Sequence, residues 1–93
     1  MLKVNEYFDG KVKSIALKSG ALPETVGVMD QGEYEFGTSQ KETMTVVSGE
    51  MAVQLPGESG FTTYRKGDQF IVEANQKFQL KITGQVAYLC SYE

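Results

Sequence analysis

Apolar and polar residues alternate along this 93-residue chain with the two-residue period of a β-strand. In 42–46, Glu42, Met44 and Val46 share one face, and two threonines share the other. The same alternation returns over 88–92, within the last strand candidate. No apolar pattern with a 3.6-residue period is long enough for a substantial helix. The pattern therefore predicts an all-β protein.

Turn-forming residues divide this pattern into nine short strands. Typical breaks are Ser19-Gly20, Pro56-Gly57 and Thr83-Gly84. Tyr7-Phe8, ahead of the first break, could add a short turn or an arm. Nine strands at this even spacing are typical of a sandwich or a jelly-roll barrel. The predicted strands are roughly 11–17, 25–29, 33–38, 42–48, 51–55, 61–65, 69–73, 77–82 and 86–92.

Two glycine-punctuated segments resemble the two motifs of the cupin family. The first runs from Gly32 to Gly37 and continues from Glu42 to Gly49, and the second begins at Gly67. The resemblance implies one cupin domain over residues 1–93, a jelly-roll β-barrel. It also implies an interior lined by the faces that carry Glu35, Glu42, Met44, Phe78 and Leu80.

The metal ligands of a cupin are missing from these motifs. Metal-binding cupins supply a His-x-His pair and then a glutamate from the first motif, and a further histidine from the second. Here Glu35 and Gly37 occupy the two histidine positions, Phe78 occupies the last one, and the chain contains no histidine. Sites of this kind depend on imidazole nitrogens. The usual metal chemistry of the fold is therefore excluded, and we expect no metal cofactor.

Composition narrows the possible partners and compartments. A net charge of −3 and a pI near 4.9 argue against nucleic-acid polymers as partners. No apolar run approaches the length of a membrane span, and the N-terminus lacks a signal-peptide-like stretch, so no membrane is expected. Cys90 is the only cysteine, which favours the reducing cytoplasm. A small domain buries little surface, so a homodimer is expected.

Longer runs carry a more specific resemblance. The small bacterial pyrimidine/purine nucleoside phosphorylases have runs similar to Asn5–Ser14, Val26–Met29, Gly32–Phe36, Glu42–Gly49 and Tyr88–Tyr92 of this chain. The resemblance implies a homodimer that splits nucleosides of both classes with inorganic phosphate as co-substrate. The products would be a free base and a pentose 1-phosphate.

Such a reaction needs donors for phosphate, and the chain offers three candidate cations. Lys11 and Lys13 are two residues apart, so both side chains leave the same strand face. They could bind one phosphate together, or they could belong to a solvated strand edge. Arg65 offers a planar fork suited to phosphate, but it adjoins a turn where a surface position explains it equally well.

Glu42 and Glu35 are the candidate catalytic carboxylates. Either could hold the ribose hydroxyls or stabilise positive charge at the anomeric carbon. Either could instead satisfy a buried donor in a purely structural role. Glu33 is expected on the opposite face from Glu35 and is a weaker candidate. Without histidine, a general acid would have to be a carboxylic acid, a tyrosine or water.

Four aromatic residues could stack on the base, namely Tyr34, Phe36, Tyr88 and Tyr92. Stacking tolerates every base, which suits a broad substrate range. Each of them could equally belong to the core or to a dimer contact. Cys90 is expected to be a small buried hydrophobe, because no histidine is available to activate it.

Two functional classes therefore remain open. One is a metal-free phosphorylase, and the other is a non-catalytic cupin that binds a small sugar or a nucleoside. The absence of histidine makes a dioxygenase or isomerase cupin a poor third alternative.

Overall fold

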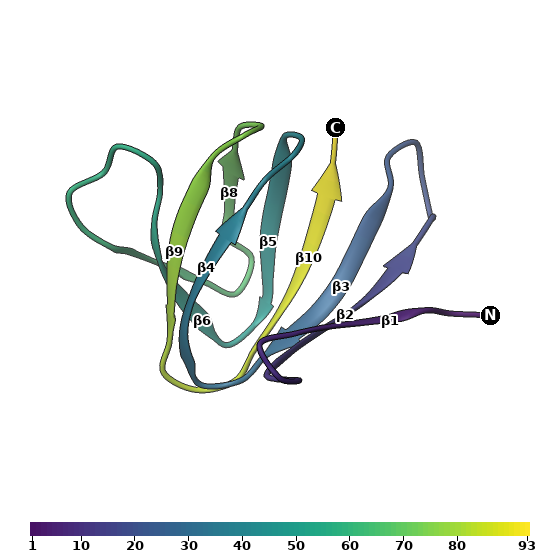
Figure 1. Cartoon of the computed structure of the whole chain (residues 1–93), viewed down its shortest axis with the longest axis horizontal. Helices are drawn as coiled ribbons and strands as arrows, with labels where there is room; N and C mark the ends of the chain where they lie inside the picture. Colours follow the sequence, from purple (N-terminus) through teal and green to yellow (C-terminus); the bar gives the residue numbers. More distant parts are fainter.

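A computed structural model describes all 93 residues and contains ten β-strands and no helix (Figure 1). All nine predicted strands are present, and their ends agree to within one residue. The tenth, β1, occupies the segment that the sequence suggested could be an arm. The strands are β1 (Val4–Tyr7), β2 (Val12–Leu17), β3 (Glu24–Met29), β4 (Gly32–Gly37), β5 (Glu42–Ser48), β6 (Glu50–Gln54), β7 (Thr62–Arg65), β8 (Gln69–Val72), β9 (Lys77–Ile82) and β10 (Val86–Tyr92).

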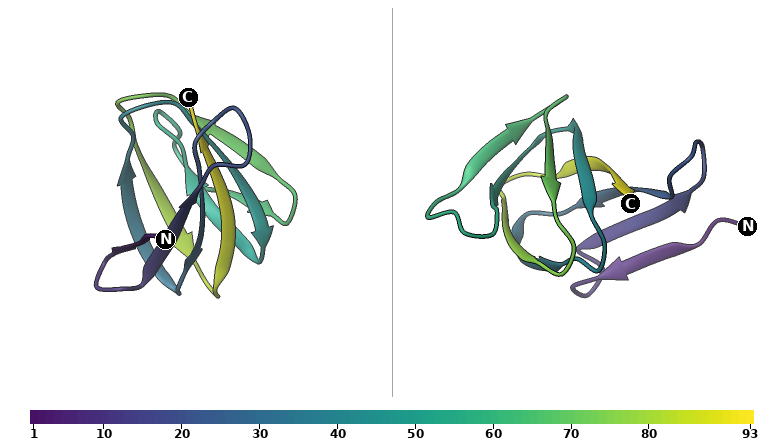
Figure 2. Two further views of the ribbon diagram at one scale, coloured as in Figure 1. Left: turned by 90° about the vertical axis from the view of Figure 1, so that its right-hand side faces the viewer. Right: turned by 90° about the horizontal axis from the view of Figure 1, so that it is seen from above.

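The strands form two antiparallel sheets that face each other across the core (Figures 1 and 2). The larger sheet has the order β1-β2-β3-β10-β5-β8, and the smaller has the order β4-β9-β6-β7. Strands far apart in sequence pair as neighbours, because β10 lies between β3 and β5. The all-β prediction is confirmed. The structure contains no helix of the length and apolarity needed to cross a membrane.

Strand alternation sorts the side chains between the core and the surface. Met44, Phe78 and Leu80 are buried, as predicted, with at most 4% of their surface exposed. The prediction that Glu35 faces the interior is wrong, because Tyr34 and Phe36 take the inward positions of β4. Glu33 also faces outward, so it shares a face with Glu35 and does not oppose it. The cupin motif thus predicted the inward positions of this strand one residue away from where the structure has them.

The turn between β1 and β2 folds aromatic side chains across the open edge of the two sheets. Phe8, Asp9 and Gly10 all have positive φ angles, of 54°, 57° and 84°. This left-handed turn brings the Phe8 ring to 4.9 Å from the Tyr34 ring, between centroids. The Tyr7 ring lies 6.4 Å from that of Phe36. The N-terminal strand of the larger sheet is thereby tied to β4 of the smaller one.

Candidate active site

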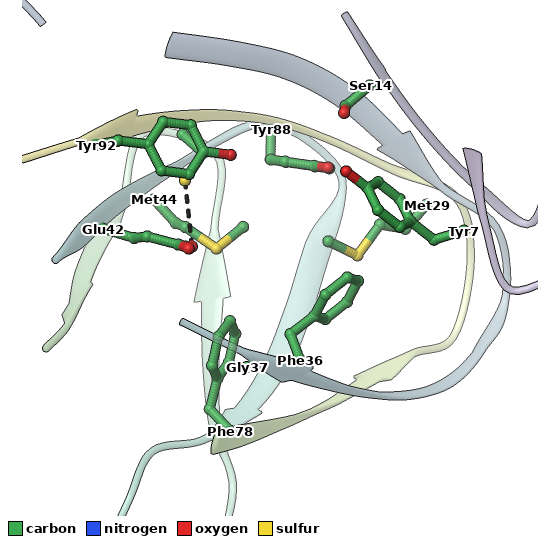
Figure 3. A pocket seen from close by; sticks show the side chains of 11 residues that line it. Tyr7, Ser14, Met29, Phe36, Gly37, Glu42, Met44, Phe78, Tyr88 and Tyr92 are labelled. Atoms are coloured by element: carbon green, nitrogen blue, oxygen red, sulfur yellow. Dashed lines mark hydrogen bonds between the residues drawn. The ribbon is translucent and has the colours of Figure 1, made fainter. Parts of the chain in front are cut away.

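A cavity of about 230 Å³ lies between the two sheets. The larger sheet contributes side chains from β1, β2, β3, β5 and β10, and the smaller sheet contributes β4 and β9. Figure 3 shows these side chains pointing toward a common space. The 11 lining residues are Tyr7, Ser14, Met29, Phe36, Gly37, Glu42, Met44, Phe78, Tyr88, Cys90 and Tyr92.

One end of the cavity holds its only charged side chain. Glu42 is half-buried on β5, and the Cys90 thiol donates a hydrogen bond of 3.4 Å to its Oε1. Burial raises the pKa of Glu42 above its ordinary value, and the bond from Cys90 acts against that rise. The neighbouring Tyr92 hydroxyl pairs with the Thr25 hydroxyl at 2.9 Å. We name Glu42, Cys90 and Tyr92 the carboxylate end of the cavity.

The Cys90 thiol is not activated by this arrangement. Burial and the nearby Glu42 carboxylate raise the pKa of Cys90 to about 12. A thiol with this pKa carries a negligible thiolate fraction at neutral pH, and the thiolate is the nucleophilic form. Its 2% exposed surface confirms the expectation of a small buried residue.

The other end of the cavity is lined by hydroxyl groups. Tyr88 on β10 and Ser14 on β2 are both paired with Gly27 of the strand between them. A Cβ atom on Gly27 would lie 2.5 Å from the Tyr88 hydroxyl, so only glycine allows the ring to cross β3. Tyr7 enters the same region from β1, and its hydroxyl points toward that of Tyr88 (Figure 3). We name Tyr7, Ser14 and Tyr88 the hydroxyl end.

The Tyr88 hydroxyl remains protonated in this setting. Burial, followed by the Cys90 and Tyr7 groups, raises the pKa of Tyr88 to about 12, while the Ser14 hydroxyl acts in the opposite direction. The Tyr88 hydroxyl is therefore neutral at physiological pH and can donate a hydrogen bond.

Several predicted site residues converge on the cavity. Glu42, Phe36, Tyr88 and Tyr92 line it together. Tyr34 is buried beside it but does not line it, and its hydroxyl donates a 2.7 Å bond to the main-chain oxygen of Asp30. Burial and Asp30 raise the pKa of Tyr34. The structure thus gives Tyr34 a packing contact, and substrate roles for the other four stay predictions.

Four further predicted residues lie outside the cavity. Lys11 and Lys13 are exposed on the solvent side of the first strands, and Lys13 Nζ lies 3.6 Å from a Glu6 carboxylate oxygen. The other two belong to the smaller sheet. Arg65 Nε lies 3.4 Å from a carboxylate oxygen of Glu50, and Glu35 accepts a 2.8 Å bond from Gln79 Nε2. Phosphate binding by the three cations and catalysis by Glu35 stay predictions, and none of these residues lies at the cavity.

Of the three residues at the hydroxyl end, sequence reasoning named Tyr88 and missed Tyr7 and Ser14. Ser14 was identifiable in principle, because the alternation that sends Lys11 and Lys13 outward sends Val12 and Ser14 inward. Tyr7 had no comparable signal, because β1 is only four residues long and was not predicted as a strand. Gly27 could be recognised only once Tyr88 was known to be its neighbour in the sheet.

The residues present do not fit the metal centre of a metal-binding cupin. No group of three or more His, Cys, Asp or Glu side chains gathers closely enough to hold a metal ion. The cavity itself offers one carboxylate and one thiol among hydroxyl, thioether and aromatic groups. A reaction without metal stays a prediction.

The family profile and the similar proteins that match this chain carry the same description. The profile of the family described as "Pyrimidine/purine nucleoside phosphorylase" matches residues 2–92. A protein of that name from Magnetococcus marinus is 61% identical over 92 residues, covering 99% of both chains. Another from Cellvibrio japonicus is 60% identical over 93 residues, covering 100% of both.

Solved structures share the fold. A protein of unknown function from Vibrio parahaemolyticus superposes with a TM-score of 0.95 at 45% identity, over 100% of this chain and 99% of that chain. An RmlC-like cupin from Shewanella frigidimarina superposes with a TM-score of 0.77, over 98% of this chain and 82% of that one. Its 20% identity shows the fold alone. The cupin prediction is therefore confirmed.

Proposed function

Because this chain belongs to the pyrimidine/purine nucleoside phosphorylase family, we propose that it splits nucleosides with inorganic phosphate in the cavity between its sheets. The bond between C1′ and the base nitrogen breaks, and a bond between C1′ and a phosphate oxygen forms. The base gains one proton, and hydrogen phosphate loses one as the pentose 1-phosphate forms. Atoms and charge balance without a cofactor.

The observation that carries this proposal is the placement of Glu42. Its half-buried carboxyl group projects into a cavity lined mainly by apolar and aromatic side chains. A buried carboxylate destabilises a fold unless it is compensated, and the Cys90 thiol is a weak donor. The transition state at C1′ carries positive charge on the sugar, which a nearby carboxylate stabilises. Glu42 would make that contact, or hold the ribose hydroxyls beside it.

Broad specificity follows from the apolar walls of the cavity. The Phe36 and Phe78 rings are stacked, with centroids 6.0 Å apart and planes at 27°. Met29 and Met44 complete these walls with flexible thioethers. Flat and deformable apolar surfaces accept purines and pyrimidines alike, because neither reads the hydrogen-bonding edge of a base.

The proposal is tested by incubating the purified protein with uridine or adenosine, with and without inorganic phosphate. Free base should appear only with phosphate, and the pentose should appear as its 1-phosphate. Release of base without phosphate, with free ribose, would identify a hydrolase. Thermal stabilisation by a nucleoside without any base release would favour the non-catalytic binding cupin.

We further propose a homodimer formed through the outer face of the larger sheet. Val4, Ile15, Val26 and Leu89 form one continuous row across four neighbouring strands. Val26 is 44% exposed although its neighbours in this row are apolar. A contiguous exposed apolar patch is typical of an interface. A second copy related by two-fold symmetry would cover this row with the same row of its own.

The compartment is also a proposal. Cys90 is a buried free thiol, and nothing in the fold depends on a disulfide. This fits the reducing cytoplasm, where the protein would act on free nucleosides and phosphate. The net charge of −3 supports such small partners over nucleic-acid polymers.

A further inference from the structure

We infer that the hydroxyl end of the cavity, Tyr7, Ser14 and Tyr88, is the phosphate subsite of the reaction. The inference rests on the proposed phosphorolysis and names the groups that receive its second substrate. It differs from the lysine site that the sequence suggested, because all three groups are hydroxyls and none is an ammonium group.

The charge distribution of the cavity supports this placement. None of its 11 lining residues is a lysine or an arginine, and its only charged side chain is Glu42. A carboxylate repels a phosphate anion, so phosphate is favoured at the end opposite to Glu42. Figure 3 shows Tyr7 and Ser14 on the far side of the cavity from Glu42. Lys13, the charged residue next to Ser14 in sequence, is exposed on the opposite face of β2.

The available donors point to the same end. The Tyr34 hydroxyl is bonded to the main-chain oxygen of Asp30, and the Tyr92 hydroxyl is paired with Thr25. The Ser14 hydroxyl interacts with that of Tyr88, and a pair of hydroxyls of this kind can turn its protons toward an anion that binds beside it. Ser14 and Tyr88 are 4% and 6% exposed, so little water competes for them.

The backbone positions this group of hydroxyls in two specific ways. Gly27 leaves the space through which the Tyr88 ring reaches Ser14. The left-handed turn at Phe8 and Asp9 follows Tyr7, and the packing of Tyr7 on Phe36 holds its ring at the cavity. Together these two features hold the three hydroxyls at one end of the cavity.

The first experiment measures steady-state kinetics of Tyr88→Phe and Tyr7→Phe with phosphate and nucleoside varied separately. Each variant loses one hydroxyl and keeps its ring. We expect the KM for phosphate to rise about 10-fold or more, as loss of a hydrogen bond to an anion predicts. The KM for the nucleoside should change by less than about 3-fold by the same comparison. Tyr64→Phe is the matched control, because Tyr64 packs on Phe70 and does not line the cavity.

A second variant moves the hydroxyl without removing it. Gly27→Ala forces the Tyr88 ring to shift, because the added methyl would lie 2.5 Å from its hydroxyl. It should raise the KM for phosphate as Tyr88→Phe does, in protein that circular dichroism shows to be folded. If the tyrosine variants raise the KM for the nucleoside and leave that for phosphate unchanged, the inference is wrong. The inference is also wrong if Lys13→Ala raises the KM for phosphate and the tyrosine variants do not.

Direct titration separates this inference from the proposed function. Inorganic phosphate is titrated into the wild-type protein and into Tyr88→Phe, followed by ³¹P NMR. Binding by the wild type and at least about 10-fold weaker binding by the variant support the subsite even if no nucleoside is cleaved. Equal binding by both proteins, or binding by neither, overturns it while leaving the phosphorolysis assay to decide the function.

Discussion

The inner and outer faces of the larger sheet are built from the same strands, and each face carries exceptions to the usual sorting of polar and apolar side chains. On β10, Tyr88 and Cys90 face the cavity, whereas Leu89 between them faces outward. On β2, Ser14 faces inward, whereas Ile15 is 37% exposed. The buried face, which is mostly apolar, thus includes hydroxyl and thiol groups, and the exposed face includes a row of aliphatic side chains.

These exceptions separate two uses of one sheet. A domain stabilised by its core alone would place apolar residues inside and polar residues outside. The buried Glu42 opposes that arrangement, and its raised pKa records the cost of desolvation. Val26 departs from the same arrangement, because it is an apolar residue exposed on the outer face. A reaction in the cavity would explain the buried Glu42. A second copy of the chain, packed on the outer face, would explain the exposed Val26.

The strongest way to break this comparison is Glu42→Gln, which keeps the shape of the side chain and removes its charge. Turnover should fall about 10- to 100-fold, corresponding to roughly 1.5–3 kcal/mol for a charged hydrogen bond. Steady-state assay at saturating phosphate measures this. Full activity in the folded variant would return Glu42 to a structural role.

The same variant should be more stable than the wild type at neutral pH. Because the folded-state pKa of Glu42 is raised, the folded protein holds this proton more tightly than the unfolded chain does. The contribution of Glu42 to stability therefore declines as pH rises from the ordinary carboxyl range through the folded-state pKa. Thermal melts of both proteins should diverge over that range and converge at lower pH. A lower melting temperature of the variant at neutral pH would contradict this.

The outer face is tested by Val26→Asp, which places a charge in the centre of the aliphatic row. A charge buried between two copies is strongly unfavourable, so the dimer should dissociate to monomer in light scattering after gel filtration. The fold should persist, because Val26 is 44% exposed in the single chain. Gln69→Asp, at the opposite edge of the same sheet, is the control that should leave the assembly intact. A monomeric wild type would remove the explanation offered for this face.

A smaller effect is expected at Cys90, which separates a packed thiol from a reactive one. With its pKa near 12, the thiol in the folded protein should resist alkylation by iodoacetamide at about pH 8, where an ordinary thiol of pKa about 8.5 reacts. The unfolded chain should react at the ordinary rate. Mass spectrometry of the alkylated protein in buffer and in denaturant makes the comparison. Rapid labelling of the folded protein would contradict the packing described here.

The smallest effect is expected from Lys13→Ala. Its exposed ion pair with Glu6 contributes about 0–1 kcal/mol to stability, as is typical of surface pairs. The KM for phosphate should change by less than about 2-fold, because the side chain points away from the cavity. Lys11→Ala should behave in the same way. A large increase in the KM for phosphate would restore the lysine site that the spacing suggested.

Much of this protein was determined by the sequence alone. The two-residue period and the turn residues located nine strands, because a strand with one buried face must alternate. The absence of histidine removed the imidazole ligands of a metal-binding cupin, because no other side chain supplies an imidazole. Alternation also predicted that Tyr88 and Tyr92 share a face, and both line the cavity.

Only the tertiary structure decided which face of β4 turns inward. Glu35 and Phe36 alternate whichever way the strand is placed, and packing of Phe36 on Phe78 chose the aromatic face. The hydroxyl end likewise depends on pairing between strands distant in sequence. Tyr88 meets Ser14 only because β10 lies beside β3 and Gly27 leaves room between them. The local sequence determines which side chains share a face of a strand. The neighbouring strands determine which of the two faces is buried, because burial is a property of the assembled sheets.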